Sequence, residues 1–575
     1  MRFENWEISG FDRAAAVDFC REGINPLVSV FLTSRGMGNI EDARAFLGNS
    51  SCEIHDPFLL AGMDKAVSRI NAAIDKGERI AVYGDYDVDG MTSCAILSLW
   101  LRSKGVDFEI YIPSRLGEGY GLNCAALDIL KSHGVSLVIT VDCGITAADE
   151  AKHARSLGMG LVITDHHECR EELPEAEAVV DPKRPDCSYP NKALAGVGVT
   201  FKLICALERE CPPDEIARKY IDLVAIGTVA DVMPVLGENR ELIRRGLNVL
   251  NDRPRVGLFN LMREYYAEHR KINAATVGFG LAPRLNAAGR MGQTGLSVEL
   301  LLTDNEAEAE RLTTELLFLN SERRRLETEI FREAVAMLPE SGPDGPIVLA
   351  RRGWFQGVTG IVAAKMAERY LVPAIIISID DEGVGRGSCR SAGAFGIYGA
   401  LRSCEELLDN YGGHDMATGV TIAEENIDEL RRRIYQYYLD SIGTTQVPSL
   451  HLDFEVEKPE LLTIRNVEAL ADLEPFGNGN APPCLCIRGA ALSAVCSIGA
   501  GKHTRFKIEK AGKTLDCIFF AMPSEDLGVS GDMIVDVAFE PQINEYRGRS
   551  SVQLQVFDIR ESQMSAGSEG TTWTR

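Results

Sequence analysis

From about residue 79, short apolar runs alternate with longer segments whose apolar residues recur at helical spacing. Fully apolar runs predict strands buried on both faces, and the intervening segments, each ending near a glycine, predict helices. The predicted strands are 79–83, 108–112, 136–141 and 161–164, and the predicted helices are 91–104, 125–132 and 147–157. This alternation is typical of a parallel sheet covered on both faces. Ligands of such sheets bind beyond the carboxyl ends of the strands.

The pattern changes further along the chain. Residues 305–338 form a long, strongly charged helical stretch, which predicts a helix between two domains, and SGPDGP at 341–346 marks a boundary. A second alternation of strands and helices follows, to about residue 442. From about residue 451, short alternating segments predict a small antiparallel β-barrel. These segments are 506–508, 515–519, 535–539 and 552–556.

The predicted fold class is therefore α/β, with a parallel-sheet domain, a long connecting helix, a second, smaller α/β domain and a C-terminal antiparallel β-barrel. The expected parts are an N-terminal segment (1–50), the sheet domain (51–303), the connecting helix (304–340), the smaller domain (341–445), the barrel (446–562) and a tail (563–575). The tail is rich in Ser, Gly and Thr, which predicts disorder. The N-terminal segment has no assigned role.

Composition narrows the setting. The 575 residues are 45% hydrophobic and 25% charged, which is an ordinary globular composition. The net charge of −24 argues against a general basic face that coats duplex DNA, although a local basic groove is compatible with it. An apolar run long enough to span a membrane does not occur, and the first ten residues lack the apolar core of a signal peptide. Fifteen cysteines without CxxC pairs fit reduced thiols, so the cytoplasm is expected.

Acidic and imidazole side chains follow three of the predicted strands. They are Asp85, Asp87 and Asp89 in YGDYDVDG, Asp142 in VITVDCG, and Asp165, His166 and His167 in VITDHH. A parallel sheet gathers its strand ends at one edge, where several carboxylates repel one another unless cations lie among them. The pattern therefore predicts a metal site. Imidazole among carboxylates favours manganese or another transition metal.

Simpler interpretations exist for the single residues. Asp85 or Asp89 alone would read as a cap of the following helix, His167 alone as a surface histidine, and Asp231 alone as a helix terminus. An EF-hand loop starting at Asp85 needs a Glu at its twelfth position, but Ile96 stands there, and the loop follows a strand. We therefore exclude the EF-hand. The joint occurrence at three strand ends favours a functional site.

Taken in order, YGDYDVDG, VDCG, DHH and GTVADVMP resemble the four motifs of the DHH phosphoesterases. Three further segments resemble the RecJ branch of that family: APRLNAAGRMG (282–292), GGHDMATG (412–419) and ADLEPFGNGN (471–480). The second is similar to the glycine-rich motif of the DHH-associated domain, and the third to the entry into an OB-fold, of which GKHTRFKI fits a strand. The resemblance covers roughly residues 50 to 560.

This resemblance implies an exonuclease that digests single-stranded DNA from the 5′ end to mononucleotides, in DNA repair and recombination, with two Mn2+ ions or with Mg2+. The implied metal ligands are Asp87, Asp89, Asp142, His166 and Asp231, with Asp142 shared by both ions. Asp85 is then a ligand or a partner of a ligand, and His167 contacts the scissile phosphate. Relatives in the wider family often have His where this chain has Tyr83.

Substrate contacts are implied by the same motifs. These residues are Arg284, Asn286, Arg290, Ser388, Arg390, Gly412, Gly413 and His414. Arginine forks suit phosphate, although a surface salt bridge is the simpler interpretation of any single Arg. Phe355 stands where relatives often have His, and it either stacks on a base or packs in the core.

The expected partner is single-stranded DNA, with a helicase or a single-strand binding protein as further candidates and no membrane. Two alternatives stay open. One is a DHH-type phosphodiesterase of small nucleotides or oligoribonucleotides, against which the barrel and the APRLNAAGRMG segment argue. The other is a non-catalytic single-strand-binding scaffold of replication, which has no need of the complete ligand set found here.

Overall fold

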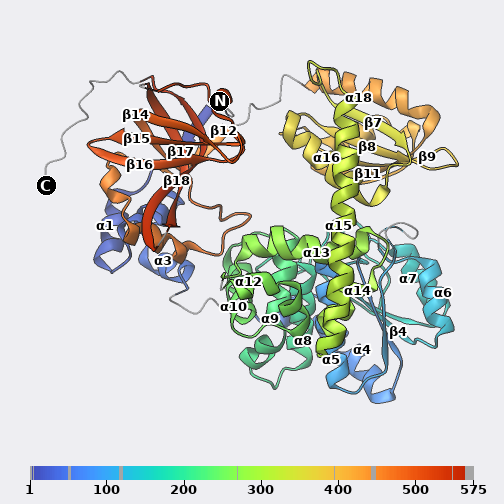
Figure 1. Cartoon of the computed structure of the whole chain (residues 1–575). Helices are drawn as coiled ribbons and strands as arrows, with labels where there is room; N and C mark the ends of the chain where they lie inside the picture. Colours follow the sequence, from blue (N-terminus) through green and yellow to red (C-terminus); the bar gives the residue numbers. More distant parts are fainter. Residues whose placement is uncertain are drawn as a thin grey trace. The chain divides into compact units, whose positions relative to one another are not determined.

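Two compact units make up the computed structural model (Figure 1). The larger unit contains Glu53–Gln446 together with Gly477–Gly479, and the barrel unit contains Met1–Cys52, Val447–Phe476 and Asn480–Arg575. The structure describes residues 3, 5–48, 54–114, 119, 121–268, 270–393, 395–441, 449–531, 533–546 and 548–563. The tail that was expected to be disordered lies outside these residues from 564 onward.

The larger unit contains the predicted parallel sheet. Its strands run in the order β3-β2-β4-β5-β6, and every neighbouring pair is parallel. The strands are β2 (Ile80–Gly84), β3 (Phe108–Tyr111), β4 (Leu137–Val141), β5 (Gly160–Thr164) and β6 (Ala178–Val180). β2, β4 and β5 are buried along their whole length, as their apolar runs predict. The short strand β6 was not predicted.

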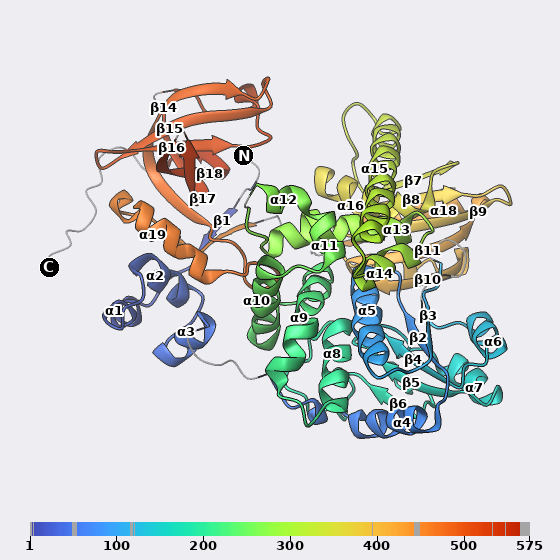
Figure 2. The ribbon, with the colours of Figure 1, turned by 60° about the horizontal axis from the view of Figure 1, so that its bottom comes forward.

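Helices cover both faces of this sheet (Figure 2). Because side chains alternate along a strand, Val82 packs on one face, against α4 (Met63–Lys76), α5 (Val88–Ser103) and α8 (Gly196–Leu207). Ala81 packs on the other face, against α6 (Cys124–Ser132) and α7 (Ala148–Ser156). The two apolar cores fix the sheet from both sides, so the strand ends are held rigidly.

A helical layer follows the sheet along the chain. It consists of α9 (Pro213–Ala230), α10 (Gly237–Asp252), α11 (Val256–Leu261), α12 (Arg263–Ala267), a π-helix (Thr276–Leu281), α13 (Ala282–Arg290) and α14 (Gly295–Leu302). The predicted connecting helix is α15 (Glu306–Ala336). Its first half buries Leu312 and Leu316 in the core of the parallel-sheet part. Its second half buries Ile330 and Ala334 against the next sheet, so α15 belongs to both cores.

The second sheet has the order β10-β11-β9-β8-β7, in which only β7 and β8 are parallel. Its strands are β7 (Ile347–Arg352), β8 (Ala374–Ile379), β9 (Val384–Arg390), β10 (Leu408–His414) and β11 (Ala417–Ala423). Its helices are α16 (Gln356–Tyr370), α17 (Ile397–Arg402) and α18 (Ile427–Ser441). α16 packs with α15 on one face, and α17 and α18 cover the other.

The predicted C-terminal barrel is confirmed. Five strands run in the order β14-β15-β16-β18-β17, and β17 pairs back with β14 to close the ring. They are β14 (Leu485–Ile498), β15 (His503–Lys510), β16 (Lys513–Phe519), β17 (Ile534–Tyr546) and β18 (Arg549–Glu561). One pair, β16 with β18, is parallel. A closed ring with an odd number of strands must contain at least one parallel pair, so the barrel cannot be antiparallel throughout.

The first 48 residues belong to the barrel unit. β1 (Asn5–Ile8) pairs in parallel with β12 (Ser449–Leu452). The helices α1 (Arg13–Arg21), α2 (Pro26–Ser34) and α3 (Ile40–Phe46) pack with α19 (Ile464–Glu468) and β13 (Phe454–Glu455). The ring of Phe31 lies 5.0 Å from that of Phe454. The N-terminal segment therefore completes the core beside the barrel.

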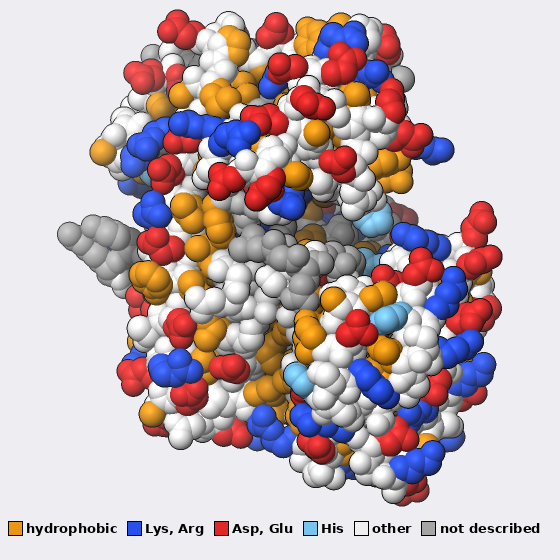
Figure 3. Space-filling view, turned by 90° about the vertical axis from the view of Figure 1, so that its right-hand side faces the viewer, with side chains coloured by type: hydrophobic (Ala, Val, Ile, Leu, Met, Phe, Trp, Pro, Cys, Tyr) orange, Lys and Arg blue, Asp and Glu red, His pale blue; other side chains and the backbone are white. Residues whose placement is uncertain are grey.

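Two surface properties bear on ligands. On the face drawn in Figure 3, acidic and basic side chains are interspersed instead of forming one basic surface, in keeping with the net charge of −24. Of the helices in the described ranges, none combines the length and the apolar character needed to cross a membrane.

Candidate metal centre

The predicted site residues meet at the switch point of the parallel sheet. β3 lies on one side of β2 and β4 on the other, so the loops after β2 and β4 diverge and leave a crevice between them. Asp85 and Asp87 follow β2, Asp142 follows β4, and His166 follows β5. Asp231 joins them from the C-terminal end of α9.

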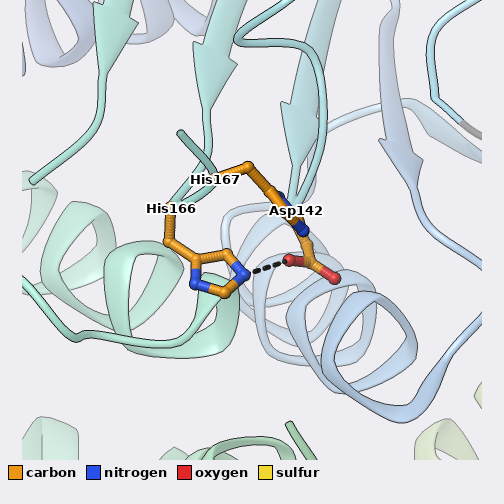
Figure 4. Close-up of side chains that lie close together, drawn as sticks. All are labelled: Asp142, His166 and His167. Carbon is orange, nitrogen blue, oxygen red and sulfur yellow. Dashed lines mark ion pairs between the residues drawn. The ribbon is translucent and has the colours of Figure 1, made fainter. Parts of the chain in front are cut away.

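Ligand atoms gather in three overlapping groups, within each of which they lie inside 4.8 Å of one another. The first group is Asp85, Asp87 and Asp142, and the second is Asp89, His166 and Asp231. Asp142 links them, because its Oδ1 lies 3.1 Å from Nε2 of His166 (Figure 4). Nε2 of His166 is also 3.5 Å from Oδ2 of Asp231 and 3.8 Å from Oδ2 of Asp89. A further group joins Asp142, His166 and His167. All seven predicted catalytic residues therefore converge.

Several buried atoms of this cluster have no hydrogen-bond partner within the described ranges. Oδ1 of Asp142, Oδ2 of Asp231 and Nε2 of His166 are among them. A buried acceptor without a donor is costly, so a cation that accepts these lone pairs would stabilise the arrangement. Carboxylates with one imidazole form a donor set that fits a divalent ion such as Mn2+ or Mg2+. The residues therefore fit a divalent metal.

Burial and mutual repulsion raise the pKa values of the carboxylates. Burial, followed by the charge of Asp231, raises the pKa of Asp89 well above its ordinary value. Burial and the charge of Asp89 do the same for the pKa of Asp142, and burial with the charge of Asp87 raises the pKa of Asp231 to about 7. Each shift has the same origin: negative charges are held close together away from water. A divalent cation removes this repulsion, which again favours a metal.

The pKa values of the two histidines shift in opposite directions. Burial, followed by the charge of His167, lowers the pKa of His166 to about 3, so its imidazole is neutral and able to act as a ligand. Burial alone would lower the pKa of His167 too, but Asp165 overrides it and raises that pKa to about 9. Nδ1 of His167 lies 2.7 Å from Oδ1 of Asp165. The contact with Asp165 thus favours the protonated ring of His167 at neutral pH.

Asp165 is a residue whose role was missed from the sequence. Its Oδ1 accepts the backbone N–H of His166 at 2.7 Å, and its Oδ2 accepts the backbone N–H of Ile145 at 2.9 Å. The carboxylate is thereby turned toward the loop after β4 and the ring of His167. Asp165 positions the histidine pair instead of joining the ligand groups.

Two glycines allow the helices α8 and α9 to pack closely against the carboxylates of Asp142 and Asp89. The backbone N–H groups of Gly196 and Val197, at the start of α8, donate to the carboxylate of Asp89 at 2.6 and 2.8 Å. A Cβ on Gly196 would lie 2.5 Å from Oδ1 of Asp142, and a Cβ on Gly227 would lie 2.9 Å from Oδ1 of Asp89. Sequence reasoning missed both glycines. The signals were the glycine-rich run AGVGVT at the start of α8, which contains Gly196, and the motif GTVADVMP, which begins with Gly227.

Local backbone geometry aims the side chains. Asp142 has φ 62°, in the left-handed region, while its N–H still donates to Thr164 at 3.0 Å. The chain thus turns sharply at the end of β4, as is common for strained functional residues. The cap of α5 is Asp87, whose Oδ1 accepts the N–H of Gly90 at 3.1 Å. Neither Asp85 nor Asp89 is that cap, and α5 begins at Val88, not at 91.

Tyr83, which stands where wider relatives often have His, is fully buried on the face covered by α6 and α7. Its ring stacks on Tyr111, and its hydroxyl donates to the carbonyl of Gly121 at 2.9 Å. Tyr83 is absent from the ligand groups found among the described residues. Asp85 and His166 are present there instead.

Three of the predicted substrate-binding residues lie on α13, and their contacts differ. The guanidinium of Arg284 forms an ion pair with Glu264 and donates to the carbonyl of Leu261, so structural contacts occupy it. Asn286 is half-buried. Arg290, at the end of the helix, donates through Nη1 to the carbonyl of Gly357 at 3.3 Å.

The end of α13 also touches the loop that carries Asp85 and Asp87. A Cβ on Gly289 would lie 2.6 Å from the carbonyl oxygen of Tyr86 in that loop. The next residue along α13 is Arg290, whose Nη1 reaches Gly357 in α16. This helix end thus connects the ligand loop with the second sheet domain.

Ser388 and Arg390 of β9 face the first turn of α16. Oγ of Ser388 lies 3.1 Å from Oγ1 of Thr359. A Cβ on Gly360 would lie 3.2 Å from Nη2 of Arg390 and 3.3 Å from Oγ of Ser388. Arg290, Ser388 and Arg390 therefore surround the N-terminal end of α16, where backbone N–H groups favour an anion.

The remaining predicted residues extend the same face of the second sheet. Gly412, Gly413 and His414 lie in the edge strand β10. Across the strands, Ser388, Gly419 and Gly412 form one row, and Arg390, Ala417 and His414 form the next. A Cβ on Gly412 would meet no atom within 4 Å, so this row is open and shallow. Phe355 packs, partly buried, against the core between α15 and α16.

Models of three known domains match the chain. The DHH family N-terminal domain matches residues 79–228, the DHHA1 domain matches 344–439, and the RecJ OB domain matches 452–558. The matched ranges contain the parallel sheet, the second sheet and the barrel, respectively. The fold and the ligand cluster thus define a DHH protein with an associated DHHA1 domain.

Similar proteins show to which family of DHH proteins the chain belongs. The chain is 39% identical over 563 residues to the single-stranded-DNA-specific exonuclease RecJ of Bacillus subtilis, covering 97% of this chain and 71% of that one. It is 33% identical to RecJ of Escherichia coli, covering 87% and 90%. The crystal structure of RecJ with Mn2+ from Thermus thermophilus superposes with a TM-score of 0.83 at 31% identity, covering 98% of this chain and 81% of that one. The Mg2+ complex of that RecJ gives 0.77 at 30% identity, covering 97% and 79%. The chain belongs to the RecJ family.

Proposed function

We propose that the protein is an exonuclease that hydrolyses single-stranded DNA from its 5′ end and releases mononucleotides, in DNA repair and recombination. The observation that carries the proposal is the pair of ligand groups at one sheet edge, linked by Asp142. Membership of the RecJ family supports it, because the named relatives are single-stranded-DNA-specific exonucleases.

The two groups suggest which side chains would hold two divalent cations. Asp85, Asp87 and Asp142 would hold one, and Asp89, His166, Asp231 and the shared Asp142 the other. Bound divalent cations supply a water of lowered pKa and neutralise charge on the phosphate. The imidazole among carboxylates favours Mn2+ over Mg2+. Structures of RecJ from Thermus thermophilus contain Mn2+ in one case and Mg2+ in the other.

The protein's own groups act around that centre. His167, held as a cation by Asp165, would stabilise negative charge that develops on the phosphoryl oxygens. Neutral His166 keeps its lone pair for a ligand role. A Ser or Cys nucleophile is not required, because water attack completes the hydrolysis.

The anion-binding end of α16 offers a reason for 5′ polarity. A terminal phosphate carries more negative charge than an internal diester, so it is the better ligand for Arg290, Ser388 and Arg390 at a helix N-terminus. An enzyme that grips the 5′ phosphate at a fixed place beside the scissile centre would cut one nucleotide at a time from that end. The open row at Gly412 would let the strand continue across the sheet.

The alternatives are less well supported. A phosphodiesterase of small nucleotides has no need of the barrel that matches the RecJ OB domain. A non-catalytic scaffold has no need of seven converging side chains. The helicase or single-strand binding partners and the cytoplasmic location stay predictions from the sequence.

The test uses single-stranded DNA labelled internally, with the 5′ or the 3′ end blocked, in Mn2+ or in EDTA. We expect Mn2+-dependent release of mononucleotides that only the 5′ block prevents, and loss of activity in Asp142→Ala. The exposed Asp149 on α7 provides a matched control, and Asp149→Ala should behave as the wild type. Inhibition only by the 3′ block would overturn the polarity, and cleavage of very short oligomers alone would favour the small-nucleotide enzyme.

A further inference from the structure

The turn that follows Asp231 is strained. α9 ends there, and the N–H of Met233 donates to Thr228 at 3.2 Å while the N–H of Val232 donates to Val229 at 3.1 Å. This pair of bonds is the Schellman arrangement, in which the residue after the cap is usually glycine. Here it is Val232, with φ 56°. A β-branched residue in the left-handed region is held there only by its surroundings.

Packing of the Val232 side chain does not hold the turn, because 64% of that residue is exposed. The turn is nevertheless important, since the preceding residue, Asp231, brings its carboxylate to 3.5 Å from His166. A change of backbone angles at Val232 would move Asp231 directly. Some other contact must therefore fix this backbone.

That contact comes from Gly477–Gly479, which belong to the larger unit although the rest of their motif, ADLEPFGNGN, lies in the barrel unit. Nδ2 of Asn478 donates to the carbonyl of Val232 at 2.9 Å. The carbonyl of Asn478 accepts the N–H of Val235 at 2.7 Å. One residue, 246 positions further along the chain, thus bridges both sides of the turn.

The two flanking glycines allow this close approach. A Cβ on Gly477 would lie 2.6 Å from Cγ2 of Val235. Gly479 has φ 75°, and a Cβ there would lie 3.1 Å from Cδ1 of Leu236. The sequence Gly-Asn-Gly therefore combines one bridging amide with two positions that must lack a side chain.

We propose that Asn478 is a positioning residue of the metal centre: it clamps the strained turn at Val232 and so holds the carboxylate of Asp231 in the second ligand group. The inference rests on the proposed metal-dependent function and adds a residue outside the sheet domain to it. Residues that orient metal ligands typically change metal affinity or activity 10- to 100-fold when lost.

The test measures Mn2+ binding directly, with the full-length chain, by titrating free Mn2+ under electron paramagnetic resonance. Asn478→Ala removes the amide donor and is expected to weaken the binding of one Mn2+ about 10-fold. In turnover assays the Mn2+ concentration needed for half-maximal rate should rise, while the rate at saturating Mn2+ falls much less. The melting temperature without metal and the affinity for single-stranded DNA in EDTA should stay unchanged.

A matched control and a rescue sharpen the result. Asn466 also donates its amide to a backbone carbonyl, that of Leu461 at 2.8 Å, and Asn466→Ala should leave Mn2+ binding unchanged. Glycine adopts the turn without strain, so Val232→Gly in the Asn478→Ala background should recover part of the lost affinity.

The outcomes separate the two proposals. If the wild type binds no Mn2+, the proposed function fails. If the wild type binds Mn2+ and Asp142→Ala does not, the proposed function stands; equal affinity in Asn478→Ala would then overturn the clamp alone. Loss of affinity equal to that in Asn466→Ala would also overturn it, because the effect would then be general destabilisation.

Discussion

The two sheets of the larger unit carry their polar residues in different ways. The parallel sheet concentrates carboxylates at the ends of β2, β4 and β5, where Asp85 and Asp142 are almost fully buried. The mixed sheet spreads its polar residues in rows across β9, β11 and β10, where Gly412 and His414 are exposed. The first arrangement brings groups of like charge together, whereas the second leaves a surface open.

This difference separates two tasks. A buried cluster of acids needs exact spacing, which glycines such as Gly196 provide by letting helices approach the carboxylates. An open face needs donors and free space but tolerates displacement. Changes at the first sheet should therefore act on the chemical step, and changes at the second sheet should act on strand binding.

The largest effect is expected from Gly196→Ala. The new Cβ would lie 2.5 Å from Oδ1 of Asp142, so either Asp142 or α8 must shift. A misplacement of about 1 Å at a catalytic centre can cost about 10²-fold in rate. We expect kcat to fall about 100-fold with little change in affinity for DNA. The measurement is a steady-state assay of mononucleotide release in Mn2+.

Gly198→Ala on the same helix is the matched control. Its Cβ would meet the flexible side chain of Leu194 at 3.2 Å, so kcat should change less than about 3-fold. Equal losses in both variants would mean that α8 tolerates no added methyl group anywhere, and the argument from close approach would fail.

A smaller effect is expected at the anion-binding end of α16. Arg390→Ala should remove most of the preference for a 5′-phosphorylated strand over a 5′-hydroxyl strand, by about 10-fold in kcat/KM, because a charge-assisted contact is lost. Competition between the two substrates in one reaction measures the preference. Arg352→Ala is the control, since Arg352 on β7 pairs with Glu424. An unchanged preference in Arg390→Ala would contradict the phosphate role.

The smallest effect is expected at the open row. Gly412→Val adds a side chain where no atom lies within 4 Å, so the fold should be kept. The added side chain would obstruct the surface of the sheet over which the DNA is proposed to run. We expect KM to rise about 3-fold, with unchanged kcat and Mn2+ affinity. Gly38→Val, equally free of neighbours, serves as the control in the barrel unit. A fall in kcat instead of a rise in KM would show that the two sheets do not divide the tasks.

The sequence predicted the parallel sheet well because uninterrupted apolar runs such as β4 are a strong signal. Since the carboxyl ends of parallel strands meet at one edge of the sheet, Asp85, Asp142 and His166 were then expected to lie together. It predicted the second sheet only in part. β9, β10 and β11 contain glycines, such as Gly387, that weaken the pattern of a strand. The period of the helices also leaves their first turns undetermined, so α5 begins at Val88, three residues before its predicted start at 91.

Roles that depend on tertiary contacts could not be predicted. The motif of Arg284 suggests a phosphate contact, which stays a prediction, whereas its ion pair with Glu264 could not be inferred from any local pattern. The support of Asp89 by Gly196 joins residues 107 positions apart. The family resemblance supplied Asp231, whose position at a helix end alone would have suggested nothing. Long-range geometry, not composition, decides such roles.

The proposed function requires two divalent cations that share Asp142. Anomalous diffraction at the manganese edge, from crystals grown with Mn2+, tests it most directly. We expect two peaks about 4 Å apart, both ligated by Asp142, one beside Asp85 and Asp87 and the other beside Asp89, His166 and Asp231. A single peak, or two peaks of which only one is ligated by Asp142, would contradict it.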